Sequence, residues 1–202
     1  MTTETIQDIP IFPLGTVLFP DGVMPLRIFE QRYVDMTKAC IGGDSTFGVC
    51  LILDGREAGE PAVPHAVGCT ARIVDWDVPT PGLFNLRVRG ERVFRIDERH
   101  VQHDGLIRAH VTLLPPAQPA PVDGNYGGLT QLYERIVEQF GADVFPAPQR
   151  PQDGIWLSHR LAELLDLPLA ARQRLLETSD PSAKQSLLWE SLRAQAEPGG
   201  SA

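Results

Sequence analysis

The sequence predicts an α+β protein in which a small curled antiparallel sheet or barrel, with one inserted helix, precedes a helical subdomain. Apolar and polar residues alternate through the first two-thirds of the chain, and beyond residue 121 the apolar residues recur at helical spacing. Between these parts lies a proline-rich segment, residues 115–121 (PPAQPAP), which cannot continue a sheet and is expected to be a stiff connector. We therefore expect a β-rich domain over residues 1–118 and a helical domain over residues 119–202.

Short strands are predicted for most of the first domain. The runs with strand character lie at residues 9–12, 16–19, 24–29, 47–53, 67–73, 84–96 and 107–113. Gly90 interrupts the alternation within its run and predicts a bulge or a sharp bend. Residues 30–41 change to helical period, and Gly42 and Gly43 are expected to end that helix in the left-handed conformation.

The second domain is predicted to be entirely helical. An apolar stripe over residues 129–140 is closed by Gly141, and a second proline-rich link covers residues 146–151. The next helix is expected to carry one apolar side, formed by Leu157, Leu161, Leu164 and Leu165. Pro168 restarts a short helix, and Asp180 before Pro181 is typical of an N-cap that opens a last helix.

Composition narrows the possible function classes. Of 202 residues, 43% are hydrophobic and 22% are charged, which is ordinary for a folded protein. The longest apolar run, residues 47–53, is far shorter than the roughly 20 residues of a membrane span. The first residues, MTTET, lack the basic and apolar regions of a secretory signal. We expect a soluble cytoplasmic protein with no membrane partner.

Charge argues against nucleic acid as a partner. The net charge is −8, so the chain gains little from counterion release on a phosphate backbone. One arginine cluster stands out, formed by Arg87, Arg89, Arg92, Arg95 and Arg99. Because Glu91, Asp97 and Glu98 lie among these arginines, the cluster is interpreted as a mixed, solvated strand face.

The sequence lacks the common catalytic and cofactor motifs. It contains no G-x-x-x-x-G-K-[ST], no helix-opening G-x-G-x-x-G and no H-E-x-x-H, so no cofactor is expected. Ser45 lies in an imperfect nucleophile elbow and is interpreted as part of a turn. Cys40, Cys50 and Cys69 lie in apolar patterns and are expected to be reduced core thiols rather than metal ligands.

The tryptophans differ in their surroundings. Trp156 and Trp189 fall in predicted helices and are expected to pack inside, whereas Trp76 lies at a strand end and is expected to be exposed. Asp75 and Asp77 alternate around Trp76, so both carboxylates should leave the same strand face. We interpret them as a polar strand end rather than as an acid–base pair.

One segment carries a family resemblance. Residues 9–20 (IPIFPLGTVLFP) followed by residues 24–33 (MPLRIFEQRY) resemble the opening signature of the Lon N-terminal, or substrate-binding, domain family. Further similar segments follow in order along nearly the whole chain, at residues 47–52, 67–73, 88–96, 161–168 and 184–188. The resemblance implies a PUA-like pseudo-barrel of mostly antiparallel strands that leads into a helical subdomain.

The resemblance also implies a function without catalysis. In full-length Lon proteases this domain helps to select unfolded or tagged polypeptides and supports hexamer assembly, while the ATPase and the Ser–Lys peptidase lie further along the chain. Here Lys38 and Lys184 are the only lysines, and Ser182 lies too close to Lys184 for the family's dyad. We therefore expect a stand-alone, non-enzymatic member of the family.

Two interpretations of the signature residues remain open. In the structural one, the apolar residues are core and the turns are shaped by proline and glycine, with Arg32 paired to an acid. In the functional one, exposed side chains near the turn at residues 19–24 and near the strand end form an apolar polypeptide-binding groove. Its members would be Phe19, Pro20, Met24, Trp76 and Phe84.

Four hypotheses about function follow. The leading one is an adaptor or holdase-like module that binds exposed apolar polypeptide segments, with a protease or ATPase partner and homo-oligomerisation both possible. The second is RNA binding through the PUA-like fold. The third is a metal-dependent hydrolase that uses His100, His103 and Asp104. The fourth is a small-ligand site in a barrel mouth.

Overall fold

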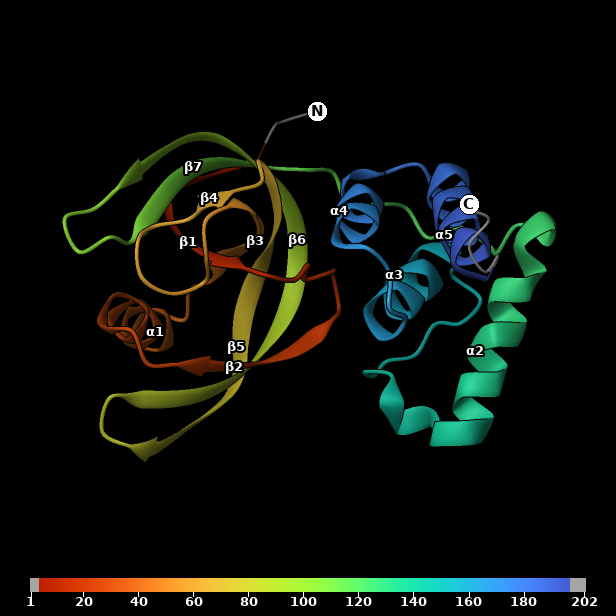
Figure 1. Cartoon of the computed structure of the whole chain (residues 1–202), viewed down its shortest axis with the longest axis horizontal. Coiled ribbons are helices and arrows are strands. Elements are labelled where there is room, and N and C mark those ends of the chain that lie inside the picture. The colour runs from red at the N-terminus through yellow and green to blue at the C-terminus, as the bar shows by residue number, and fades with distance from the viewer. Residues whose placement is uncertain (1–3, 197–202) are drawn as a thin grey trace, which may run out of the picture. The chain divides into compact units, whose positions relative to one another are not determined.

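The computed structural model describes residues 4–196, and within it the chain divides into two compact units (Figure 1). The first unit, Met1–Pro116, contains all seven strands and one helix, and the second, Ala117–Ala202, contains the remaining helices.

The first unit is a closed but irregular sheet. Its elements in chain order are β1 (Thr5–Leu14), β2 (Val23–Ile28), α1 (Gln31–Gly43), β3 (Phe47–Asp54), β4 (Val63–Pro64), β5 (Val67–Thr80), β6 (Leu83–Val101) and β7 (Ile107–Leu113). The strand order is β1-β7-β6-β5-β3-β4, and β1 also pairs with β3, so the ladder returns to its start. The β1–β3 pair is parallel, while β2 adds to β6 outside the closed path. The predicted α+β pseudo-barrel of mostly antiparallel strands is confirmed.

Two apolar clusters fill this unit. The larger one joins α1 to the inner faces of the strands through residues such as Tyr33, Phe47 and Leu86, and the smaller one centres on Phe94. The structural interpretation of the signature residues holds for Phe12, Leu14, Val17, Leu18 and Ile28, which are all buried, and Leu26 is partly buried. The three cysteines are buried and free, and burial raises the pKa of Cys50 to about 12.

Residues 16–19 were predicted to form a strand, and this prediction is wrong. The segment has no strand pairing, although Val17, Leu18 and Phe19 are buried. The chain crosses β6 here instead: the amide of Asp21 donates to the carbonyl of Gly90 (2.8 Å), and the amide of Gly90 donates to the carbonyl of Gly22 (2.9 Å). A Cβ on Gly90 would overlap the carbonyl oxygen of Phe19, so only glycine permits this crossing. The β5–β6 register shifts beside Gly90, as the sequence predicted for a bulge.

Helix α1 follows its predicted pattern but ends differently. Tyr33, Met36, Thr37 and Cys40 are buried as one face. The left-handed terminal residue is Asp44 (φ 45°), not Gly42 or Gly43 as predicted, because the helix continues through both glycines. Arg32 does pair with an acid: its guanidinium lies 2.9 Å from Glu30 and also donates to the carbonyls of Gly59 (2.7 Å) and Gly105 (3.1 Å).

The second unit is helical, as predicted. It contains η1 (Gly124–Tyr126), α2 (Gly127–Phe140), η2 (Ala142–Val144), α3 (Gly154–Leu164), α4 (Leu169–Glu177) and α5 (Pro181–Ala196). Asp180 caps α5, since its carboxylate accepts from the amide of Ala183 (2.7 Å). On α3, Leu157 and Leu161 are fully buried, whereas Leu164 is 43% exposed, so the predicted apolar side is narrower than expected.

Polar side chains are buried between α3 and α5. Lys184 lies 2.6 Å from the Nε2 atom of His159, and the two side chains are 2% and 5% exposed. Burial lowers the pKa of Lys184 to about 8. Burial, with the positive charges of Lys184 and Arg160, lowers the pKa of His159 well below its ordinary value. The imidazole is therefore neutral at pH 7, and its Nε2 accepts the lysine hydrogen bond.

Candidate functional site

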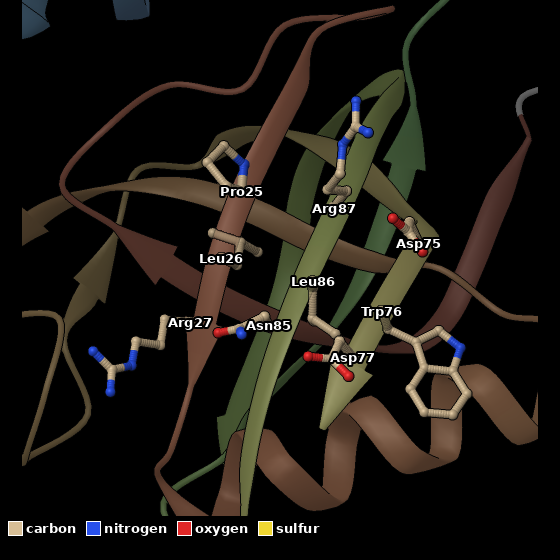
Figure 2. Close-up of a pocket in the computed structure, with 9 residues that line it drawn as sticks. All are labelled: Pro25, Leu26, Arg27, Asp75, Trp76, Asp77, Asn85, Leu86 and Arg87. Carbon is tan, nitrogen blue, oxygen red and sulfur yellow. The ribbon is translucent and has the colours of Figure 1, made fainter. Parts of the chain in front are cut away.

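A shallow open groove of about 510 Å³ lies where three strands of the first unit run side by side. Figure 2 shows its nine lining side chains, three from each of β2, β6 and β5. They are Pro25, Leu26, Arg27, Asp75, Trp76, Asp77, Asn85, Leu86 and Arg87. The groove combines apolar groups with both signs of charge.

Strand register assigns these side chains to two faces. Leu86 pairs with Leu26 on one side and with Trp76 on the other, so the three share the face that leads into the core. On the opposite face, Arg87 pairs with Pro25 and Asp75, and Asn85 pairs with Arg27 and Asp77. The prediction that Asp75 and Asp77 leave one face of the strand is confirmed by this register.

The β5–β6 hairpin carries the most exposed part of the groove. Its turn is formed by Pro81 and Gly82, and Gly82 has a φ of +83°, the conformation that favours glycine at the third position of a type II turn. Towards this turn β5 leaves the core, and every residue from 74 to 80 is exposed. Three of them are large and apolar: Val74, Trp76 and Val78 are 48%, 50% and 40% exposed.

Trp76 is the aromatic centre of this surface. Its ring centroid lies 6.3 Å from that of Phe84, and its indole projects beyond β5 on the side away from β6 (Figure 2). Half of the indole is thus held by the protein and half faces solvent. Tryptophan in this setting offers a large apolar contact area with little conformational freedom to lose.

The five residues predicted to line the groove differ in their exposure to solvent. Trp76 is exposed as expected, while Pro20 and Met24 are half-buried. The expectation that Phe19 and Phe84 are exposed is wrong, because Phe19 is completely buried under the crossing at Gly90 and Phe84 is only 7% exposed. Phe84 supports Trp76 from inside, and Met24 pairs with Val88 further along the same three strands.

Sequence reasoning missed Val74 and Val78 as surface residues. Their signal was the persistence of β-branched residues around Asp75 and Asp77, which marks a strand that continues after leaving the core. Phe29, which follows β2 and is 63% exposed, was also missed.

The residues of the metal-dependent hydrolase hypothesis have other partners. Asp104 accepts from the amide of Leu106 (3.0 Å) within a turn, and His100 lies 4.0 Å from Asp8. Within residues 4–196, no group of three His, Cys, Asp or Glu side chains could hold a metal ion. None of the helices in the same range has the length and apolarity that a membrane crossing requires.

Two arginines of the cluster, Arg92 and Arg95, form ion pairs with acids. Arg92 pairs with Glu4 (3.3 Å) and Arg95 pairs with Asp97 (3.3 Å). Glu91, which lies among these arginines, binds Arg72 at 2.5 Å. These pairs agree with the interpretation of a mixed, solvated strand face.

Comparison with known proteins identifies the family. Residues 8–194 match the model of the ATP-dependent protease La (LON) substrate-binding domain, so the chain belongs to that family, and the resemblance seen in the sequence is confirmed. The crystal structure of a Lon N-terminal domain protein from Xanthomonas campestris has 36% sequence identity and a TM-score of 0.77, over 92% of this chain and 98% of that one.

The chain also matches longer proteins over a part of their length. Lon protease of Cytophaga hutchinsonii is 28% identical over 85% of this chain and 22% of its own length. Protein cereblon of Xenopus tropicalis is 31% identical over 55% of this chain and 25% of its own length. The chain thus spans about a quarter of the length of these curated relatives.

Proposed function

We propose that this protein is a non-catalytic, cytoplasmic module that binds polypeptides through exposed apolar segments and acts as an adaptor or holdase-like factor. The exposed indole of Trp76, flanked by Val74 and Val78 in a unit whose other apolar groups are mostly packed inside, is the observation that carries this proposal. Membership of the substrate-binding domain family supports it. A protease or ATPase partner is compatible with it, because neither activity has its motifs in this chain.

Binding would be driven by the burial of apolar surface around Trp76, whose side chain is already held in place. Trp76 already rests against Phe84, so a bound segment needs to cover only the solvent side of the indole. Covering the exposed half of a tryptophan and two valines favours association by a few kcal/mol, at about 25 cal/mol per Å². Such a surface suits many sequences that share apolar character, which is what recognition of unfolded chains requires.

The test measures binding to a permanently unfolded polypeptide. We expect reduced and carbamidomethylated ribonuclease A to bind the protein and native ribonuclease A not to bind. Trp76→Ala should weaken binding about tenfold, because the anchor of the surface is removed. Isothermal calorimetry or fluorescence anisotropy provides the measurement.

A matched control is available in the helical unit. Phe140 on α2 is 65% exposed, so Phe140→Ala removes a comparable apolar surface at a distance in sequence from the groove. It should leave the affinity unchanged, and both variants should keep the parent's thermal stability within about 1 kcal/mol because neither site is in the core. Equal loss in both variants, or no binding by the parent at high micromolar concentration, would contradict the proposal.

A further inference from the structure

On the side away from β6, the outer half of β5 has no strand partner within the part of the chain that the structure describes. On the side away from β6, β5 pairs with β3 only through Cys69, Thr70 and Ala71. From residue 72 to the hairpin turn, no other strand within residues 4–196 pairs with that side. The register of this segment with β6 is regular from Asp75 to Asp77 and shifts on either side, between Ile73 and Asp75 and between Asp77 and Thr80. Apart from Pro79, which has no N–H, the backbone amides and carbonyls on this side therefore have no strand partner within the described residues, which is the arrangement that accepts an added strand.

The side chains along this edge alternate between apolar and acidic. Trp76 lies on the face of Leu86, while Asp75 and Asp77 lie on the opposite face. Asp77 stands beside the uncharged Asn85, and neither Asp75 nor Asp77 forms an ion pair with another residue of the described chain. Arg87 is the register neighbour of Asp75, so Asp77 is the less compensated of the two carboxylates.

This pattern disfavours pairing between two copies of the chain. In an antiparallel pair centred on Trp76, Asp75 of one copy would lie directly opposite Asp77 of the other, twice. Like charges directly opposite each other destabilise a sheet, whereas opposite charges stabilise it. The same carboxylates therefore favour an incoming strand that carries lysine or arginine at alternate positions.

We propose that β5 binds its polypeptide partner by strand addition along residues 73–80, and that it prefers extended segments in which apolar residues alternate with basic ones. The apolar side chains of the segment contact Trp76, and its basic side chains lie opposite Asp75 and Asp77. This inference rests on the proposed polypeptide-binding function and specifies its geometry and its substrate class.

The first test of this inference uses synthetic peptides of about eight residues, the length of a typical strand. Acetylated and amidated peptides that alternate Val with Lys, Ser or Glu are compared by calorimetry at low salt. We expect the Lys peptide to bind about fivefold more tightly than the Ser peptide, and the Glu peptide to bind most weakly. The preference should shrink as salt is added, since exposed charges are screened.

Backbone pairing is tested by N-methylation of the Lys peptide at alternate residues. In an added strand, only every second amide faces β5. Methylating one alternate set should abolish binding, while methylating the other set should leave it within about twofold. Equal effects of the two sets would overturn strand addition, because a purely apolar contact does not distinguish them.

Charge reversal in the protein supplies the matched control. Asp75→Lys with Asp77→Lys should invert the order of the Lys and Glu peptides. Asp54→Lys with Asp143→Lys, at two other exposed carboxylates, makes the same change in net charge and should keep the parental order. If unfolded ribonuclease A binds but the peptides show neither charge preference nor methylation pattern, this inference fails while the proposed function stands.

Discussion

The two units differ in the charged side chains that they bury. The β unit buries Arg32 beside the carboxylate of Glu30, whereas the helical unit buries Lys184 beside the neutral imidazole of His159. Both units also expose large apolar side chains, among them Trp76 in the β unit and Phe140 in the helical unit. The β unit also exposes Phe29, Leu53 and Val101, but Val74, Trp76 and Val78 are the exposed apolar residues that lie together in one strand segment, the outer half of β5. In the helical unit, the buried charge makes stability depend on pH.

The strand β5 has a buried end and an exposed end. Residues 68–71 are buried, residues 69–71 also pair with β3, and the last seven residues of β5 are exposed. One strand thus belongs to the core at one end and to the surface at the other. We regard the buried end as the support that holds the exposed end in an extended, binding-ready conformation.

The largest expected effect is a loss of stability when Gly90, where the backbone of residues 19–22 contacts β6, is substituted. Gly90→Ala places a Cβ against the carbonyl of Phe19, which cannot move without displacing the buried segment of residues 17–19. We expect the free energy of unfolding to fall by about 3 kcal/mol or more. Urea denaturation with fluorescence detection measures it.

Gly42→Ala is the matched control for that substitution. Gly42 is inside α1, and a Cβ there meets no atom within 4 Å. It should raise the free energy of unfolding by about 0.5–1 kcal/mol, because alanine favours helix more than glycine does. A Gly90→Ala protein as stable as the parent would show that the crossing tolerates a side chain.

A somewhat smaller effect should appear in the pH dependence of stability. The folded protein holds Lys184 with a pKa of about 8 instead of 10.5, so between these values the unfolded chain binds more protons. Stability should therefore rise from about pH 8 to pH 10.5, by up to about 3 kcal/mol. Below pH 6.5 the lowered pKa of His159 acts in the same sense, and stability should fall as the pH falls.

Lys184→Met isolates the lysine contribution. The variant keeps the length of the side chain without its charge, so the rise in stability between pH 8 and 10.5 should disappear while the acid-side loss from His159 remains. Unfolding free energies measured across pH 5–11 for both proteins provide the comparison. An unchanged rise in the variant would show that Lys184 is not its source.

Much of the fold was predictable from sequence because it follows local patterns. Alternation marked β5, β6 and β7, a continuous apolar run marked β3, and the Asp–Pro pair at residues 180 and 181 marked the start of α5. Long-range contacts were not predictable in the same way. The backbone of the buried Phe19 approaches Gly90, far along the chain, and the sequence around Phe19 carries no sign of this contact.

The candidate site was only partly predictable. The exposure of Trp76 and the shared face of Asp75 and Asp77 followed from the strand pattern. The unpaired edge of outer β5 could not be predicted from the strand pattern. Whether an edge is unpaired depends on which strands pair with each other, and the periodicity along one strand does not show this. For the same reason, Phe84 was assigned to the groove although the neighbouring strands bury it.

Amide hydrogen exchange with and without unfolded ribonuclease A shows whether a bound chain pairs with the edge of β5. We expect exchange to slow at alternate amides of residues 74–78, whose outward N–H groups would become bonded to the added strand, while the amides of α2 are unaffected. Slowing confined to the helical unit, or unchanged exchange along β5 in a saturated complex, would contradict it.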